Sequence, residues 1–325
     1  MRVFITGATG FLGAAVARAL AQEGDEVHAL ARPTADRSVL DGTPITWHQG
    51  DVTVPSSLRG AMEGAAWIVH AAGRLGQLGV PEEEYHRLHV EGTRNVMAAA
   101  VAISSQTRVL HVSTTGVLGP VPGSPAAEDA PYAPANAYER SKAAAEQVAL
   151  EFSSRGLPVV ICRPGFVYGP GDRHVLGLFR AIRRGRFFFI DGGRHICHPT
   201  FISDVASGML LCLRHGRHGA IYNLVGPRAV TFKELGRTIA AALGVEAPRL
   251  VLPRWSAMLA ATGLELLGWA SGWKPPLSRT GVAFFSEDRS YTWLRARNEL
   301  GYTPEFDLAA GVAQTVAWYR ERGWL

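Results

Sequence analysis

Two periodicities of apolar residues alternate along the first half of the chain. Short apolar runs rich in β-branched and aromatic side chains, such as 2–6, indicate buried strands. Between them apolar residues recur at helical spacing, as in 11–20. The same patterns predict strands at 26–31, 45–49, 66–73, 108–113 and 157–162, and helices at 56–63, 82–102 and 135–155. Alternating strands and helices favour an α/β fold built on a doubly wound parallel sheet.

The pattern becomes less regular after residue 171. Helices are predicted at 174–184, 205–213 and 231–243, and short strands at 187–190, 199–202 and 220–225. We therefore expect a first domain at 1–171 and a smaller region at 172–325, with crossings back to the first domain.

Three glycines, Gly7, Gly10 and Gly13, separate the first predicted strand from the first predicted helix. Glycine permits a tight turn and lets a ligand approach the backbone, and the free N–H groups of a helix start attract anions. Glycines also serve ordinary turns, but this position between a strand and a helix predicts a site for a dinucleotide pyrophosphate.

Basic residues follow the second predicted strand, where dinucleotide folds meet the adenosine ribose. An acidic residue there would bond both ribose hydroxyls, whereas this chain has Arg32 and, shortly after, Arg37. A guanidinium suits a 2′-phosphate, so the sequence favours NADP over NAD as cofactor. A solvated arginine at a strand end is the alternative.

Tyr138 and Lys142 are four residues apart in a predicted helix and therefore share one of its faces. A neighbouring ammonium group favours phenolate and is expected to lower the tyrosine pKa from about 10. Such a phenol can exchange a proton with a carbonyl or alcohol oxygen. The pair alone is common on surface helices, but here the hydroxyl of Thr114 ends the preceding strand and a dinucleotide turn is present.

These motifs together resemble the extended short-chain dehydrogenases/reductases, a superfamily that includes nucleotide-sugar epimerases, dihydroflavonol reductase-like enzymes and 3β-hydroxysteroid dehydrogenases. The resemblance spans the chain. It includes Thr6-Gly7-x-x-Gly10-x-x-Gly13, Gly50-Asp51-Val52, Tyr138-x-x-x-Lys142, Arg163-Pro164-Gly165-Phe166-Val167-Tyr168-Gly169-Pro170-Gly171, Leu300-Gly301-Tyr302-x-Pro304 and Trp318-Tyr319.

The resemblance implies a Rossmann NAD(P)-binding domain at 1–171, a mainly substrate-binding region at 172–325, and catalysis by Thr114, Tyr138 and Lys142. It implies cofactor contacts from Gly7, Thr9, Gly10, Phe11, Leu12, Gly13, Arg32, Arg37, Asp51, Val52, Ala71, Ala72, Gly73, Tyr138, Lys142, Pro164, Gly165 and Val167. It also implies a homodimer formed through the helices at 82–102 and 135–152. The chain departs from the family at His89, where an asparagine usually helps to hold the catalytic lysine through water.

The residue at position 197 bears on the substrate and favours an apolar molecule. Nucleotide-sugar enzymes of the superfamily usually have an arginine for the diphosphate at the position of Cys197. We therefore expect an oxidoreductase that interconverts a secondary alcohol and a ketone on a steroid-, lipid- or polyketide-like substrate. A nucleotide-sugar epimerase or dehydratase with bound NAD, and a non-catalytic NADP-binding regulator, are the alternatives.

Apolar residues are also dense from Leu252 to Pro276, and include Trp255, Trp269 and Trp273. Most are expected to be core residues of a lid helix. The alternatives are the mouth of an apolar pocket, or contact between 255–270 and the surface of a membrane.

The composition of the chain limits the kinds of ligand and the cellular compartment that we expect. The formal charge of +5 on 325 residues is small, so we expect anionic small ligands and no nucleic acid. Three cysteines without paired or metal-type spacing, and histidines at irregular spacing, predict free thiols, no metal site and a reducing, cytoplasmic location. No signal peptide is expected before the first strand.

Overall fold

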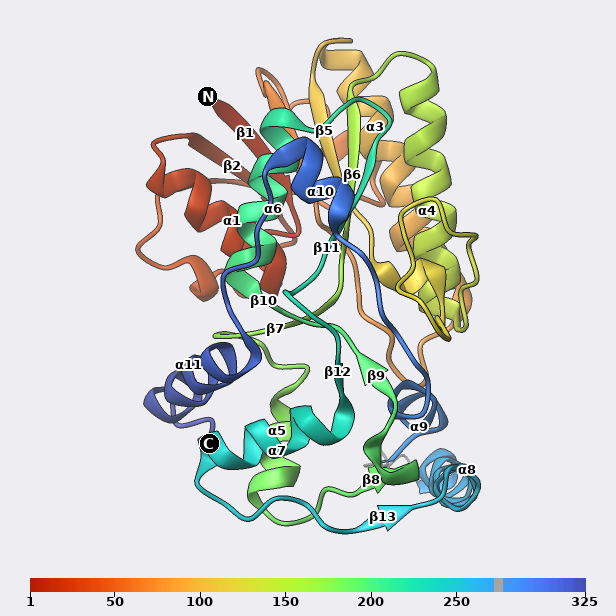
Figure 1. Ribbon diagram of the computed structural model, residues 1–325. Helices are drawn as coiled ribbons and strands as arrows, with labels where there is room; N and C mark the ends of the chain where they lie inside the picture. Colours follow the sequence, from red (N-terminus) through yellow and green to blue (C-terminus); the bar gives the residue numbers. More distant parts are fainter. Residues whose placement is uncertain (272–276) are drawn as a thin grey trace.

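A seven-stranded parallel sheet forms the centre of the computed structural model, which describes residues 1–271 and 277–325 (Figure 1). Its strands, in spatial order, are β11 (Ile221–Leu224), β6 (Val159–Pro164), β5 (Arg108–Val112), β4 (Trp67–His70), β1 (Arg2–Thr6), β2 (Glu26–Ala31) and β3 (Ile45–Gln49). Every neighbouring pair is parallel. The predicted α/β fold with a doubly wound sheet is confirmed.

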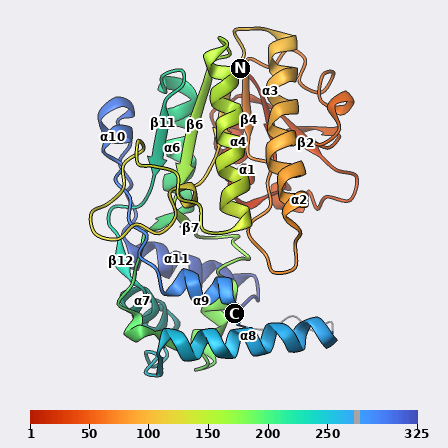
Figure 2. The ribbon, with the colours of Figure 1, turned by 90° about the vertical axis from the view of Figure 1, so that its right-hand side faces the viewer.

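Helices cover both faces of this sheet because its strands are apolar on both sides. Val3 and Ile5 pack with α1 (Phe11–Gln22) and α6 (Ile202–His215). Phe4 points to the opposite face and packs with α3 (Gly92–Ile103). Figure 2 shows α4 (Ala137–Ser154) beside α3 on that face. Alternate side chains of one strand therefore belong to two different cores.

The remaining elements gather at the end of the molecule toward which the parallel strands run (Figure 1). They are β7 (Phe166–Tyr168), α5 (Leu176–Arg183), β8 (Phe189–Ile190), β9 (Ile196–Cys197), β10 (Pro199–Phe201), β12 (Val230–Thr231), α7 (Phe232–Leu243), β13 (Val251–Leu252), α8 (Arg254–Ser271), α9 (Arg279–Phe285) and α11 (Leu308–Glu321). By contrast α6, β11 and α10 (Leu294–Leu300) lie at the sheet. The second half thus supplies one strand and two helices to the sheet region.

Two predicted helices differ from those in the structure. At 56–63 there is only a short 3-10 turn, η2 (Pro55–Ser57), followed by turns. Leu58 and Met62 are fully buried there, so their helical spacing reflects burial, while Gly60 and the positive φ of Gly64 (73°) are unfavourable to a helix. The predicted helix 82–102 is α2 (Glu82–Tyr85), a π-helical turn η3 (His86–Glu91) and α3.

Cys162, Cys197 and Cys212 are free thiols, as predicted, and all three are buried. Within 1–271 and 277–325, no helix combines the length and apolar character that crossing a bilayer requires. Trp273 lies outside the described residues.

Candidate functional site

Four segments that are distant in sequence meet where parallel strands β1, β4, β5 and β6 end. Thr6 pairs with His70, His70 with His111, and Val112 with Cys162, so the strand ends lie level. The segments that follow these strands hold most of the predicted site: Gly7–Gly13, Ala71–Gly73, Ser113–Thr114 and Gly165–Val167. Open α/β sheets bind ligands at this edge.

The glycine turn after β1 is built for close backbone approach. Gly7 has φ 79°, and a Cβ there would lie 2.6 Å from the Ala71 carbonyl carbon. A Cβ on Gly13 would lie 2.2 Å from the Gly7 oxygen, so only glycine lets α1 start this near the turn. Gly10 is exposed and forms the N-cap of α1 without any side-chain cap. The turn and the uncapped helix start therefore fit a pyrophosphate.

The predicted adenosine contacts lie at the ends of β2 and β3, beside this turn. Arg32 is exposed directly after β2, and the Arg37 guanidinium lies 5.3 Å from the centre of the Trp47 ring. The Asp51 carboxylate accepts hydrogen bonds from the backbone N–H of Thr53, at 2.9 Å, and from its hydroxyl, at 2.8 Å. Asp51 therefore shapes its own loop, and both arginines belong to the segment that follows β2.

Tyr138 lies in the first turn of α4, facing the ends of β4 and β5. The side chain of Thr114, whose hydroxyl accepts the N–H of Gly116 at 3.1 Å, is close enough to the Tyr138 phenol to oppose the rise of its pKa. The rings of Tyr85 and His89 meet the Tyr138 ring edge-on, at 6.3 and 5.8 Å between centroids. The structure thus brings together Thr114 and Tyr138, as the sequence predicts.

Lys142 lies one turn further along α4 and is buried, with Nζ donating to the Val112 carbonyl at 2.6 Å. Burial lowers the pKa of Lys142 from 10.5 to about 8, opposed in part by the nearby Glu146 carboxylate. Burial raises the pKa of Tyr138 above its ordinary value, opposed by the hydrogen bond with Thr114. The expected lowering of the Tyr138 pKa by Lys142 is not found: the pKa is raised, and the Lys142 ammonium instead donates to the Val112 carbonyl. Tyr138 is accordingly a protonated phenol at neutral pH.

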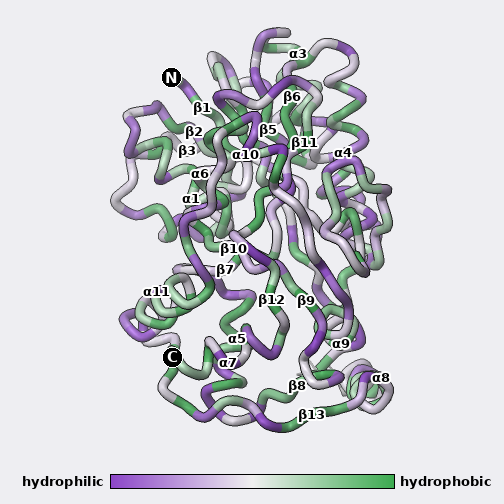
Figure 3. The backbone as a smooth tube through the Cα atoms, viewed as in Figure 1, coloured by the Kyte–Doolittle hydropathy of each residue, from purple (hydrophilic) through white to green (hydrophobic). Residues whose placement is uncertain are grey.

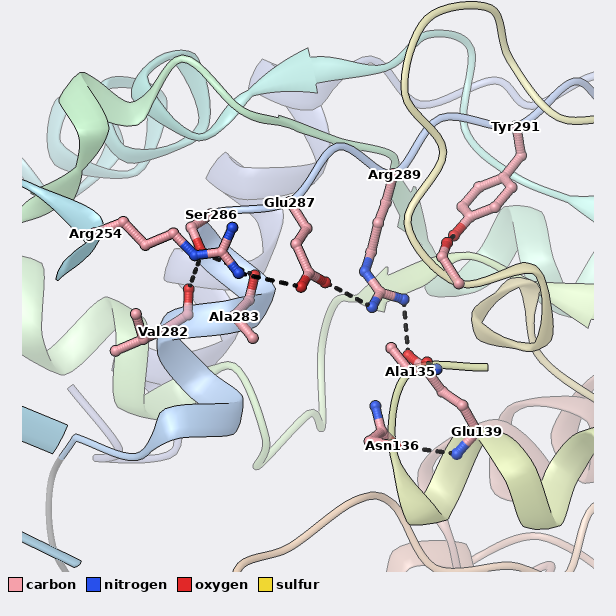
Figure 4. A network of polar contacts seen from close by, with 11 residues as sticks. Ala135, Asn136, Glu139, Arg254, Val282, Ala283, Ser286, Glu287, Arg289 and Tyr291 are labelled. Carbon is pink, nitrogen blue, oxygen red and sulfur yellow. Dashed lines mark hydrogen bonds and ion pairs between the residues drawn. The ribbon is translucent and has the colours of Figure 1, made fainter. Parts of the chain in front are cut away.

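A polar network that the sequence did not predict holds the start of α4 (Figure 4). Asn136 caps the helix by accepting the Glu139 N–H at 3.0 Å, and the Glu139 carboxylate accepts the Ala135 N–H at 2.7 Å. Arg289, from the segment after α9, reaches the same carboxylate at 2.7 Å. The Asn136-x-x-Glu139 spacing is a capping signal visible in the sequence, but Arg289 is 150 positions away.

Aromatic side chains lie next to the loop that follows β6. Phe166 is 5.3 Å from Phe284 between ring centroids, and Phe284 is 5.5 Å from Phe232. Gly165 lies close by, where a Cβ would be 2.9 Å from the Thr200 hydroxyl. Cys197 is only 1 % exposed in β9 and offers no bidentate contact to a diphosphate. The surroundings of Phe166 are therefore largely apolar.

Comparison with known proteins agrees with this geometry. The model of the NAD dependent epimerase/dehydratase family matches residues 3–225. A ketoreductase of a farnesylated dihydroquinoline oxide from Stigmatella aurantiaca is 31 % identical, with 93 % of this chain and 92 % of the relative covered. Sterol demethylase protein B from Methylococcus capsulatus is 30 % identical over 99 % of each chain. A 2-alkyl-3-oxoalkanoate reductase from Stenotrophomonas maltophilia is 28 % identical, covering 98 % of this chain and 99 % of the relative.

Solved structures agree as well. The crystal structure of gox2253 has a TM-score of 0.85 and 29 % identity, covering 99 % of each chain. The dTDP-glucose 4,6-dehydratase DesIV from Streptomyces venezuelae, solved with NAD bound, has a TM-score of 0.81 and 27 % identity over 100 % of this chain and 98 % of its own. The resemblance to extended short-chain dehydrogenases/reductases and the NAD(P) dependence of the family are thereby confirmed. The chain belongs to the NAD dependent epimerase/dehydratase family.

Proposed function

We propose that this protein is an NADP-dependent oxidoreductase that interconverts a secondary alcohol and a ketone on a largely apolar substrate. The observation that carries the proposal is the position of the Tyr138 phenol beside Thr114, with Lys142 one turn further along α4, at the sheet edge where the glycine turn lies. The partly exposed rings of Phe166 and Phe284, which follow β6 and lie on α9, respectively, favour an apolar ligand.

The chain's own residues have separable roles in this reaction. The cofactor, when bound in the glycine turn, supplies or accepts the hydride. Tyr138 donates its proton to the ketone oxygen in reduction and takes it back in oxidation. In this proposal Thr114 holds the same oxygen. Lys142 keeps a positive charge near the developing alkoxide up to a pH of about 8.

The substrate class is inferred from two independent signals. Cys197 stands where sugar-diphosphate enzymes of the superfamily usually have arginine, and its side chain is buried. Three curated relatives are named for a farnesylated dihydroquinoline oxide, a sterol and 2-alkyl-3-oxoalkanoates. A non-catalytic NADP-binding regulator would have no need of Thr114, Tyr138 and Lys142 together.

The function is tested by turnover and ligand binding on the same preparation. We expect NADPH-dependent reduction of 2-alkyl-3-oxoalkanoates or 3-oxosterols, and no stabilisation by UDP- or dTDP-sugars. Protein that is purified with bound NAD and melts at a higher temperature with a nucleotide sugar would instead support the epimerase or dehydratase alternative.

Arg32→Asp is expected to weaken NADP binding by about 10-fold or more, because a charge-assisted phosphate contact is lost. NAD binding should be unchanged or tighter, since the new carboxylate can bond the ribose hydroxyls. Fluorescence titration with both cofactors measures this, and Arg59→Asp, at another exposed arginine, is the matched control. Unchanged NADP affinity in Arg32→Asp would refute the assignment of NADP.

We also propose a homodimer formed through α3 and α4. The small exposed residues Ala98 and Ala102 on α3 and Ala144 on α4 allow two copies to approach closely, and Val101 beside them is 49 % exposed. Light scattering should give twice the 35.0 kDa chain mass. A mass of one chain would contradict this assembly.

A further inference from the structure

Helix α8 is apolar on the face that it turns away from the protein. Ala257 and Ala261 are fully buried and pack against Ile190 and Val282 of β8 and α9. The opposite face carries large apolar side chains whose exposed fractions are 72 % for Trp255, 69 % for Leu259, 64 % for Leu266 and 88 % for Trp269. A surface helix of a soluble protein normally buries its large apolar residues. The exposed apolar face therefore indicates that α8 contacts another molecule or a surface.

The apolar surface extends beyond the helix. Figure 2 shows α8 crossing the end of the molecule away from the sheet, with α9 between it and the rest of the chain. Leu250 and Val251, at β13, are 60 % and 48 % exposed, and Figure 3 shows this apolar stretch along the same end. We define the α8 face by its large exposed apolar residues: Leu250, Val251, Trp255, Leu259, Leu266 and Trp269.

Arginines border the α8 face. The side chains of Arg249 and Arg254, next to Leu250 and Trp255 in the chain, are 84 % and 49 % exposed; Arg249 lies 3.4 Å from Glu246, and Arg254 lies 3.7 Å from Glu287. Arg186 is exposed in the segment that leads into β8, the strand paired with β13. Anionic lipid headgroups would attract these arginines. A second copy of the chain would instead bring arginines of the same charge against them, which is unfavourable. Tryptophans at both ends of the exposed stripe suit the boundary between water and lipid.

We propose that the α8 face docks on the surface of an anionic lipid bilayer. This inference rests on the proposed function, because an apolar substrate would partition into that bilayer. The route from the surface is short: α9 packs on α8, and Phe284 of α9 contacts Phe166 beside the site. The helix lies in the interface in this arrangement and does not cross it.

Vesicle co-sedimentation tests the docking. The full-length protein should bind phosphatidylcholine vesicles that contain phosphatidylglycerol, and bind less tightly at high salt. Trp255→Ser/Leu259→Ser/Leu266→Ser should lower the affinity at least about 10-fold, because less apolar area is buried. Arg186→Glu/Arg249→Glu should weaken binding only to the anionic vesicles. Leu294→Ser, at a residue that is 56 % exposed on α10, is the matched control.

The outcomes separate this proposal from the proposed function. The docking would be overturned if the wild-type protein bound neither phosphatidylcholine vesicles nor those that also contain phosphatidylglycerol. It would also be overturned if the triple variant bound as tightly as wild type. A halved mass of the triple variant in light scattering would show that a second copy covers the face. Reduction of a water-soluble ketone by the triple variant should be unchanged. Vesicle binding by an inactive wild-type protein would reject only the enzyme assignment.

A second inference concerns a buried chain of hydrogen bonds between the glycine turn and α4. It runs through Thr6, His70, Thr93, His89 and Ser141. Thr93 donates its hydroxyl hydrogen to the His89 carbonyl, so it accepts from His70 Nε2 at 3.0 Å. His70 Nδ1 then carries no hydrogen and accepts from the Thr6 hydroxyl at 2.7 Å. The Thr6 oxygen in turn accepts the N–H of Ala72 at 3.3 Å.

The remaining hydrogen bonds of this series fix His89 in the other tautomer. The Arg74 N–H donates to His89 Nε2 at 3.0 Å, so Nδ1 carries the hydrogen and donates to the Ser141 hydroxyl at 2.8 Å. Ser141 donates to the Tyr138 carbonyl at 2.7 Å. Burial lowers the pKa of both His70 and His89 to about 3, so both rings are neutral at working pH. His89 lies in the π-helical turn η3, an irregularity often found at functional sites.

We infer that His89 is a positioning residue, which fixes α4 against the loop after β4. It bonds the loop at Arg74 and the helix at Ser141, midway between Tyr138 and Lys142. The loop lies close, because a Cβ on Gly73 would be 3.3 Å from His89 Nε2. A shift of the helix would move Tyr138 relative to the cofactor turn, and small displacements of a catalytic group are costly.

His89→Leu should lower kcat by about 10- to 100-fold and change the dissociation constant of NADPH less than about threefold. His89→Asn, whose amide can both accept and donate, should recover part of kcat. Nitrogen NMR of 15N-histidine-labelled protein should show hydrogen on Nδ1 of His89 and on Nε2 of His70, both neutral above pH 5. Opposite tautomers, an unchanged kcat in His89→Leu, or a uniform loss without recovery in His89→Asn would overturn the inference.

Discussion

Tyr138→Phe should reduce kcat by about 10²- to 10⁴-fold, the range that loss of a general acid or base typically gives. The phenol is the protonated group next to Thr114, and phenylalanine removes its hydroxyl alone. The dissociation constant of NADPH should stay within about twofold, because the ring contacts with Tyr85 and His89 are retained. Single-turnover reduction and cofactor titration measure the two quantities on the same variant.

Tyr85→Phe is the matched control for this change. The Tyr85 hydroxyl accepts the Gln77 N–H at 2.8 Å, and the Tyr85 ring meets the Tyr138 ring edge-on. We expect a small loss of stability and little change in kcat. A Tyr138→Phe variant that retains wild-type turnover, or loses turnover only in proportion to NADPH binding, would contradict the acid/base role.

Arg163→Met should lower the free energy of unfolding by about 3–5 kcal/mol, because it leaves a buried carboxylate without its partner. Arg163 and Glu146 are both fully buried, with a 2.5 Å contact between Nη2 and Oε1 and a 3.1 Å contact between Nε and Oε2. Glu146 lies one turn after Lys142 on α4, so the pair also anchors the catalytic helix to β6.

The double variant Arg163→Met/Glu146→Gln shows whether stability is lost because a buried charge is unpaired or because packing around Arg163 is lost. It removes both charges, so it should be more stable than Arg163→Met alone. Urea unfolding of the three proteins gives the comparison. A single variant as stable as wild type, or a double variant less stable than the single one, would contradict this account of the pair.

The parts of the fold with strong local signals could be predicted from the sequence. The strand of five residues that ends at Thr6 and the glycines after it have one consistent interpretation, and β1 and α1 follow it closely. Tyr138 and Lys142 are four residues apart, so helical geometry alone predicts that they share one face of α4. Parallel strands then bring their ends together, so the meeting of Thr114, Tyr138 and the glycine turn required no knowledge of side-chain contacts.

Contacts between distant segments could not be predicted in this way. Nothing near Glu139 in the sequence indicates Arg289, and the link of His89 to Ser141 depends on a π-helical turn that apolar spacing does not reveal. The pKa of Tyr138 also depends on burial in the folded chain, which raises it. Helical spacing at Leu58 and Met62 was misleading, because both are buried side chains in a stretch of turns.

Transfer of label from NADPH deuterated at the transferring C4 position tests the central claim most directly. With an apolar ketone substrate, an oxidoreductase should place the deuterium on the product's carbinol carbon and release one NADP⁺ for each alcohol formed. Tyr138→Phe should bind the labelled cofactor and transfer almost none. Product without deuterium, or turnover that leaves the cofactor unchanged as in an epimerase, would contradict the proposed reaction.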